Sequence, residues 1–248
     1  MRTALLTGAS RGLGRALARS LAADGWRLVV DARTGSDLDA AAEEFAAAGA
    51  EVVALRGDLA DPRHRSRLAA AAGDRLDLLM LNASSLGQAP LPPLAGYDLD
   101  AFRAVLEVNT VAALALLQLT LPGLRAAAGM VIAVSSDAAV EGYPGWGGYG
   151  ASKAALDQLA RVLAAEEPAV GVYAVDPGDM RTRMQAEAFP GEDISDRPEP
   201  ETVVPALRRL VDGRPPSGRY VAAQLLAGTA PDAAPDAAPA SVGAGERR

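Results

Sequence analysis

The sequence predicts an α/β fold with a doubly wound parallel sheet of about seven strands and helices on both faces. Its 248 residues are half apolar, which is enough to build one domain around a sizeable core. Short, nearly continuous apolar runs, typical of strands covered on both faces, alternate with longer amphipathic stretches. A glycine-rich turn stands where the first apolar run meets the first amphipathic stretch.

The expected strands are rich in Val, Leu and Ala, and they cover residues 3–7, 27–31, 51–55, 76–81, 130–134 and 170–175. The amphipathic stretches between them predict helices over residues 12–23, 36–48, 61–72, 99–121 and 150–165. Strands and helices that alternate in this way form βαβ units, and such units build an open parallel sheet.

Residues 201–211 predict a further helix, and residues 219–223 predict a seventh strand. We therefore expect residues 1–227 to form a single domain that includes the substrate loops. The last stretch, 228–248, is rich in Pro, Ala, Asp and Gly and has little apolar surface to bury. It is expected to be a disordered tail.

The net charge of −7 and the pI near 4.8 argue against nucleic acid and anionic membranes as main partners, because both are negatively charged. A small-molecule substrate is expected instead. The chain has no unbroken apolar stretch of membrane-spanning length and no signal-peptide pattern, which predicts a cytoplasmic protein. With no cysteine and one histidine, neither a thiolate nucleophile nor a metal site is expected.

The composition draws attention to Lys153, which is the only lysine among 24 basic residues. An ammonium group is compact and has an adjustable pKa, whereas a guanidinium group stays charged. Lys153 is therefore a candidate for a task that arginine cannot perform.

The glycine-rich turn TGASRGLG covers residues 7–14, between the first expected strand and the first expected helix. Gly8 permits a tight turn, Gly12 lets the backbone approach a pyrophosphate, and Gly14 lets the helix pack close to the strand. Free N–H groups at the start of the helix attract phosphate charge. The alternative is a tight turn whose glycines bind nothing.

The spacing TGxxxGxG resembles that of the short-chain dehydrogenase/reductase family, and six further motifs follow in that family's order. They are GDLAD at 57–61, LNAS at 81–84, VNT at 108–110, VSS at 134–136, YGASK at 149–153 and DPGDMRT at 176–182. The resemblance implies a Rossmann-like fold, an NAD(P)-dependent oxidoreductase, and a homodimer or homotetramer in which residues 111–121 contribute to the interface.

The resemblance also implies a set of cofactor-binding residues: Gly8, Ser10, Arg11, Gly12, Leu13, Gly14, Arg33, Asp58, Leu59, Asn82, Ala83, Tyr149, Lys153, Pro177, Gly178 and Thr182. By the same resemblance Asp58 contacts the adenine and Thr182 the nicotinamide carboxamide, while Asn82 lines the cofactor at a strand end. Each also has a structural reading, as a helix-approach residue, a helix N-cap and a turn former respectively. Ser84 departs from the family, which usually has glycine there.

The end of the second expected strand favours NADPH over NAD. Registration on the family places Ala32 at the discriminating position and Arg33 after it, and Arg11 can reach the same 2′-phosphate from the glycine turn. Asp31 is the opposing observation, because a shift of one residue would make it the acid that selects NAD. Side chains alternate along a strand, so Asp31 and Ala32 cannot both face the ribose.

Tyr149 and Lys153 are four residues apart in an expected helix, so they lie on one face. A phenol has a pKa of about 10, and a nearby ammonium group lowers that pKa towards a useful range. Ser136 lies 13 residues upstream of Tyr149. A tyrosine and a lysine four residues apart are more often an exposed surface pair. Three observations favour a site instead: the lysine is the only one in the chain, a glycine-rich segment precedes Tyr149, and Ser136 lies upstream.

The resemblance assigns each of four residues a catalytic role. Tyr149 protonates the carbonyl oxygen, Ser136 hydrogen-bonds the same oxygen, Lys153 holds the nicotinamide ribose, and Asn109 holds a water that connects Lys153 to solvent. The structural alternatives are a strand-end hydroxyl for Ser136, with Ser135 as its rival, and a helix irregularity at Asn109.

His64, amid charged neighbours, is expected on a helix surface with no catalytic role, and the chain lacks a GxSxG elbow. The substrate loops are expected at 85–93, 138–146 and 180–191. Their larger side chains predict a mainly apolar pocket made of Leu86, Val140, Tyr143, Trp146, Met180, Met184 and Phe189.

The predicted function is NADPH-dependent reduction of a ketone or aldehyde to an alcohol. An NAD-linked alcohol dehydrogenase and a non-catalytic nucleotide-binding regulator are the alternatives.

Overall fold

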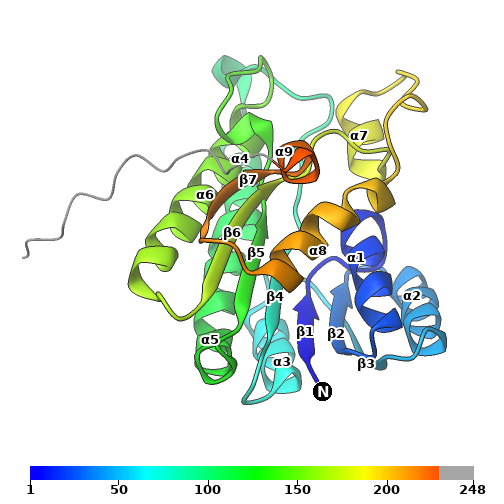
Figure 1. Ribbon diagram of the computed structural model, residues 1–248. Helices are drawn as coiled ribbons and strands as arrows, with labels where there is room; N and C mark the ends of the chain where they lie inside the picture. The colour runs from blue at the N-terminus through cyan, green and yellow to red at the C-terminus, as the bar shows by residue number, and fades with distance from the viewer. Residues whose placement is uncertain (229–248) are drawn as a thin grey trace, which may run out of the picture.

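The computed structural model describes residues 1–228, and this part of the chain forms one seven-stranded sheet in the order β3-β2-β1-β4-β5-β6-β7 (Figure 1). Every neighbouring pair of strands is parallel. The strands are β1 (Thr3–Leu6), β2 (Arg27–Ala32), β3 (Glu51–Arg56), β4 (Leu78–Leu81), β5 (Met130–Val134), β6 (Gly171–Asp176) and β7 (Gly218–Val221). The predicted doubly wound sheet is confirmed.

Helices cover both faces of the sheet (Figure 1). One face packs against α1 (Gly12–Ala23), α2 (Gly35–Ala47), α8 (Val204–Gly213) and α9 (Ala222–Ala227). The other packs against α3 (Pro62–Ala72), α5 (Ala112–Ala127) and α6 (Gly147–Glu166). Because strand side chains alternate, Ala4 and Leu6 of β1 join the first core and Leu5 joins the second. Burial on both sides explains why the strands are continuous apolar runs.

The helix expected over 99–121 is longer and irregular. It consists of α4 (Leu99–Leu106), a π-helical turn at Glu107–Val111, and α5, which continues to Ala127. By length and composition, Leu99–Ala127 is the one helix in the described residues that could cross a membrane. Its α5 part instead places Ala112, Leu116 and Leu124 in the core beneath the sheet.

Two short α-helices were not predicted. The loop expected at 180–191 contains α7 (Arg183–Ala188), which Thr182 caps by accepting a hydrogen bond from the Gln185 N–H at 3.2 Å. The strand expected over 219–223 ends at Val221, and α9 follows it at once. The expected tail, 228–248, lies outside the described residues except for Gly228.

The expectation that His64 lies on a helix surface is wrong. Its side chain is 2% exposed, and Nε2 lies 3.0 Å from Oδ2 of Asp31. The charged neighbours suggested a solvated helix, but position 64 falls on the face of α3 that meets the sheet. Gly57 lies against the imidazole so closely that a Cβ there would be 2.2 Å from Nδ1.

Candidate active site

A cleft of about 880 Å³ opens at the carboxyl ends of the strands, and residues of α7 and of the loops that follow the strands line it. Ligands of open parallel sheets bind at this edge. Most of the predicted site residues line it, namely Gly8, Ser10, Arg11, Gly12, Leu13, Arg33, Asp58, Leu59, Asn82, Ala83, Ser136, Tyr149, Pro177, Gly178 and Thr182. Gly14, Asn109 and Lys153 are buried and do not line the cleft.

The glycine turn has the backbone that a phosphate cradle needs. Gly8 and Gly12 have φ of +66° and +57°, a region that favours glycine. A Cβ on Gly14 would come within 2.7 Å of both the Asn82 amide nitrogen and the Gly8 carbonyl oxygen. Asn82 itself donates to the carbonyls of Thr7 at 2.8 Å and Gly8 at 3.1 Å. Asn82 therefore braces the turn from β4.

The start of α1 is free to receive an anion. Its N-cap residue is Arg11, whose guanidinium group has no acceptor and therefore cannot satisfy the first N–H groups of the helix. These groups and the helix dipole favour negative charge at this point of the cleft.

Asp31 is buried under the glycine turn. Its Oδ1 accepts the Gly8 N–H at 2.8 Å, and its Oδ2 faces His64 Nε2 at 3.0 Å. Both carboxylate oxygens therefore have protein partners. Arg11 and Arg33 are exposed side chains that line the cleft close to this strand end.

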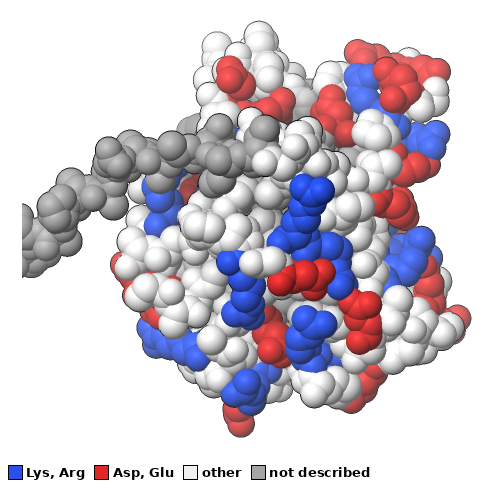
Figure 2. Space-filling view, viewed as in Figure 1, with Lys and Arg blue, Asp and Glu red and all other residues white. Residues whose placement is uncertain are grey.

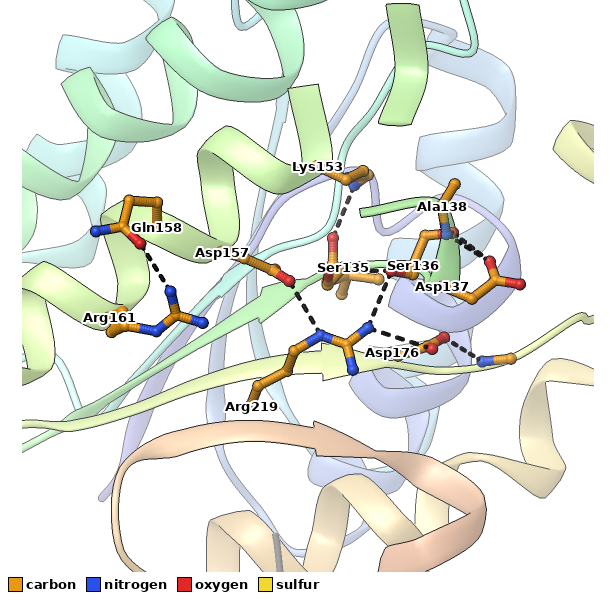
Figure 3. A network of polar contacts seen from close by, with 12 residues as sticks. Ser135, Ser136, Asp137, Ala138, Lys153, Asp157, Gln158, Arg161, Asp176 and Arg219 are labelled. Carbon is orange, nitrogen blue, oxygen red and sulfur yellow. Dashed lines mark hydrogen bonds and ion pairs between the residues drawn. The ribbon is translucent and has the colours of Figure 1, made fainter. Parts of the chain in front are cut away.

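Ser136 follows β5 and faces the cleft more openly than the buried Ser135. Its hydroxyl donates to Oδ1 of Asp137 at 2.9 Å (Figure 3). The same hydroxyl oxygen accepts the Ala138 N–H at 3.2 Å. The serine thus stands at the start of a short 3₁₀ turn, Asp137–Ala139, with its oxygen towards the cleft.

Arg219 connects the strand β7 to this serine, and the sequence analysis missed it. Its guanidinium group donates to Asp157 at 3.1 Å, to the Ser136 carbonyl at 3.1 Å and to Asp176 at 3.5 Å (Figure 3). Arg219 lies 83 positions from Ser136. Because contacts at such separations leave no spacing pattern, only the folded sheet brings these groups together.

Lys153 is buried, and its Nζ donates to the Val134 carbonyl at 2.7 Å. Nζ lies 5.4 Å from the centre of the Tyr149 ring. Burial lowers the pKa of Lys153 to about 8, although Asp157 acts in the opposite direction.

Tyr149 is almost fully buried where it lines the cleft. Burial raises the pKa of Tyr149, and the charges of Asp137 and Asp176 raise it further. The sequence argument expected Lys153 to lower the pKa of Tyr149. In the folded protein the net shift is upward, because desolvation and two carboxylates disfavour the phenolate.

Asn109 lies within the π-helical turn, as the structural alternative expected. Its Oδ1 accepts the Ser85 N–H at 2.7 Å, and its Nδ2 donates to the Ser85 carbonyl and the Ser152 hydroxyl, both at 2.9 Å. Single π-turns often mark functional sites. Here the amide fixes a substrate loop next to the residue that precedes Lys153.

The outer part of the cleft is apolar. Leu86, Ala138, Tyr149 and Ala188 form a buried cluster against which Leu91, Trp146, Met184 and Phe189 pack. The Trp146 ring lies 5.6 Å from that of Tyr149 and 5.9 Å from that of Phe189.

Five of the seven expected pocket residues line the cleft, namely Tyr143, Trp146, Met180, Met184 and Phe189. Met180 also packs against the main core. Leu86 is buried in the cluster with Tyr149 and does not line the cleft. Val140 does not line the cleft and is 62% exposed, so the expectation for this residue is wrong.

The structural readings of two cofactor candidates also hold. Thr182 caps α7, and Asp58 accepts the Ala60 N–H at 2.9 Å. Both still face the cleft, so these roles do not exclude contact with a ligand. Within residues 1–228 no group of three potential metal ligands is close enough to hold an ion.

The comparisons with known proteins agree on one family. The family model described as short chain dehydrogenase matches residues 2–193. Sepiapterin reductase from Mus musculus is 38% identical over 196 residues, which cover 73% of this chain and 75% of that protein. Glycine betaine reductase from Emericella nidulans is 32% identical over 80% of this chain, but the matched part spans only 16% of that much longer protein.

Solved structures share the fold over nearly the whole chain. A short chain dehydrogenase from Pseudomonas syringae has a TM-score of 0.83 and 33% identity, covering 89% of this chain and 93% of its own. A second, from Escherichia coli CFT073 in complex with NADPH, has a TM-score of 0.82 and 31% identity, covering 89% and 96%.

Proposed function

Because the chain belongs to the short-chain dehydrogenase/reductase family and is an NAD(P)-dependent oxidoreductase acting on alcohol and carbonyl groups, we propose that it uses NADPH to reduce a ketone or aldehyde. One observation carries the proposal. A single cleft joins the glycine turn and two arginines at one end to Ser136 and Tyr149 at the other.

The residues present fit a dinucleotide. The turn at Gly8 and Gly12 leaves no side chain between the backbone and a pyrophosphate, and the close packing at Gly14 excludes any larger residue. Ser10 and Leu13 would line the pyrophosphate, Asp58 and Leu59 the adenine, and Asn82 and Ala83 the adjoining strand end. Pro177, Gly178 and Thr182 would hold the nicotinamide. When bound, the reduced nucleotide supplies a hydride.

The choice of NADPH rests on the end of β2. Among residues 1–228 Arg11 and Arg33 have no ion-pair partner, so both could form charge-assisted hydrogen bonds with a 2′-phosphate at the cleft wall. Asp31, which would favour NAD if it met the ribose, is 2% exposed and is held by the Gly8 N–H and by His64. The NADPH bound by the Escherichia coli structure supports the same choice.

Tyr149 would donate the proton to the carbonyl oxygen, and Ser136 would hydrogen-bond that oxygen. The raised pKa of Tyr149 keeps the phenol protonated, as a proton donor must be. Lys153 would hold the nicotinamide ribose and return a proton to Tyr149. Asn109 would hold the water that links Lys153 to solvent.

A panel of ketones and aldehydes, read by the loss of nicotinamide absorbance with NADPH and with NADH, tests the function. We expect turnover that is faster with NADPH. Turnover confined to alcohol oxidation with NAD would favour an alcohol dehydrogenase. Nucleotide binding without turnover on any member of the panel would point to a non-catalytic regulator.

We also propose that the protein is cytoplasmic and works as a homodimer or homotetramer. The exposed apolar side chains Leu99, Val111 and Leu119 on the α4–α5 stretch support an interface there. Light scattering coupled to size-exclusion chromatography would measure the oligomeric state, and a monomer at micromolar concentration would contradict the proposal.

A further inference from the structure

We propose that the substrate is a carbonyl compound with a cationic ammonium group one or two carbons from the carbonyl carbon, and that Asp137 binds this cation. The inference rests on the reductase function proposed above. It specifies which substrates the outer part of the same cleft selects.

Asp137 directly follows Ser136 and presents its carboxylate at the cleft wall. Oδ1 accepts the Ser136 hydroxyl at 2.9 Å and the Ala138 N–H at 2.8 Å, and Oδ2 accepts the Tyr143 hydroxyl at 3.0 Å. An ionised carboxylate offers about four acceptor positions. Three are used here, so one position remains for a ligand on the exposed side.

Three carboxylates lie near Ser136, and they differ in whether an arginine balances their charge. Asp157 and Asp176 form ion pairs with Arg219, at 3.1 and 3.5 Å (Figure 3). Among the described residues, Asp137 forms no ion pair with a basic side chain. Its negative charge also reaches the Tyr149 phenol, whose pKa it helps to raise. A cation is therefore favoured next to the place where the carbonyl oxygen would lie.

The short distance between Ser136 and Asp137 fixes where that cation must stand in the substrate. The two side chains are 2.9 Å apart. A carbonyl oxygen on Ser136 and a cation on Asp137 would each add one contact of about 3 Å. The two substrate groups can therefore lie at most about 9 Å apart, and α- or β-ammonium ketones and aldehydes are the smallest compounds within this limit.

The hydrogen bond between Ser136 and Asp137 also increases the preference for a cationic over a neutral substrate beyond what an ion pair alone would give. Ser136 must turn its hydroxyl from Asp137 to the substrate oxygen. With a neutral substrate this breaks a charge-assisted hydrogen bond and leaves Oδ1 without a replacement. A substrate cation neutralises the carboxylate and weakens its hold on the hydroxyl, so Ser136 is released as the substrate binds.

The walls of the outer cleft suit a cation as well. Tyr143, Trp146 and Phe189 are aromatic lining residues, and ring faces attract cations. The rim segment 179–199 has six carboxylates and three arginines, and four of the carboxylates form ion pairs with these arginines. Acidic side chains gather over this segment at the upper right of Figure 2, so its net charge is negative. The opposite end of the cleft is lined by Arg11 and Arg33.

Two phenyl ketones of the same shape test the proposal. One has a trimethylammonium group on the carbon next to the carbonyl, and the other has a tert-butyl group there, so they differ by one charge. The measured quantity is the ratio of their kcat/KM values with NADPH. We expect the cationic ketone to be favoured by at least about tenfold.

The same ratio is measured in two variants that each remove one carboxylate. The electron-withdrawing effect of the ammonium group on the carbonyl is the same in every variant, so the change of the ratio between variants reports Asp137. Asp137→Asn should lower the ratio by at least about tenfold relative to the unmodified protein, and the use of a ratio cancels any general effect on Ser136. Glu141→Gln is the matched control, because Glu141 is exposed and lies outside the cleft. It should keep the preference.

A ratio near one in the unmodified protein, a ratio that is the same in Asp137→Asn as in the unmodified protein, or an equal fall of the ratio in Glu141→Gln would overturn the inference. If both ketones are reduced and the ratio does not depend on Asp137, the reductase function stands and only the cation site fails. The reverse case is a protein that binds the cation but is not a reductase. Calorimetry tests it by measuring the binding of benzyltrimethylammonium to the complex of the protein with NADP⁺. Binding that Asp137→Asn abolishes, without reduction of any carbonyl compound, would support the cation site and contradict the reductase.

Discussion

Tyr149 and Lys153 form a pair whose protonation states suit the reductive direction. Burial and two carboxylates raise the pKa of Tyr149, so the phenol keeps its proton. Burial lowers the pKa of Lys153 to about 8, so the ammonium group is present near neutrality and can lose its proton when required. The Tyr149 phenol therefore has a proton at the cleft, and the buried Lys153 ammonium group next to it has a second.

Replacing Tyr149 by Phe should remove the proton donor while preserving the packing of the ring against Trp146. We expect kcat for a carbonyl substrate to fall by at least about a hundredfold, as for loss of general acid catalysis. Affinity for NADPH, measured by fluorescence titration, should stay within about twofold. Near-normal turnover in this variant would show that another group supplies the proton.

The pH profile of reduction should report Lys153. A group with a pKa of about 8 is charged below that pH and neutral above it, so kcat should fall as pH rises through about 8. Tyr149, whose pKa is raised, stays protonated over the same range. The profile is measured with saturating NADPH, and a flat profile between pH 7 and about 9.5 would be inconsistent with the assigned role.

Lys153→Arg should fail although it retains the positive charge. The side chain is 1% exposed, and its Nζ contacts the Val134 carbonyl at 2.7 Å, so the larger planar guanidinium has no room. We expect kcat to drop by at least about tenfold. The fall of kcat as the pH rises through about 8 should also disappear, because arginine does not titrate there. Unchanged kinetics would mean that charge alone suffices. Circular dichroism checks that the variant is folded.

At the scale of elements, the connection from β1 to α1 depends on contacts from two other strands. Asn82 at the end of β4 donates to the Thr7 and Gly8 carbonyls, and Asp31 at the end of β2 accepts the Gly8 N–H. His64 of α3 holds the second oxygen of Asp31. The glycine turn is thus fixed by three elements, and its shape does not depend on glycine flexibility alone.

Gly14→Ala should weaken NADPH binding by at least about tenfold. The added Cβ would be 2.7 Å from the Asn82 amide and the Gly8 carbonyl, which would displace the turn. Isothermal titration measures the affinity. Gly213→Ala is the control, because its Cβ would meet no atom within 4 Å, and it should bind NADPH normally. Equal affinities in the two variants would show that the close approach at Gly14 is unimportant.

At the scale of the whole molecule, the cleft is assembled from almost every part of the described chain. Its wall runs from the glycine turn through the ends of β2, β4, β5 and β6 to α7. A ligand that contacts all these segments binds the folded chain and not the unfolded one. Nucleotide binding and folding stability are therefore coupled.

NADPH should stabilise the whole protein more than NADH does. At a hundred times its Kd a ligand contributes about 2.7 kcal/mol, which raises the Tm of a protein of this size by several degrees. At equal concentrations NADPH should give the larger Tm shift in a thermal-shift assay. Arg33→Ala should reduce that difference. Equal shifts with both nucleotides in the unmodified protein would contradict the assignment of NADPH.

The sequence by itself determined the sheet and the residues of the glycine turn. Buried parallel strands must be continuous apolar runs, so their number and order of appearance are visible in the chain. Motif spacing placed Ser136, Tyr149 and Thr182, and all three line the cleft. These features are local, because each depends on residues that are neighbours in sequence.

Only the tertiary structure decided the environment of those residues. His64 became a buried partner of Asp31, Arg219 joined Asp157 and Asp176 beneath Ser136, and the pKa of Tyr149 moved upward instead of downward. The contacting groups are far apart in the chain, by 33 positions for His64 and Asp31 and by 62 and 43 positions for Arg219 with Asp157 and Asp176. Burial and neighbouring charges act through space. The sequence therefore identifies the residues of the site, but it does not show how buried they are or which charges lie next to them.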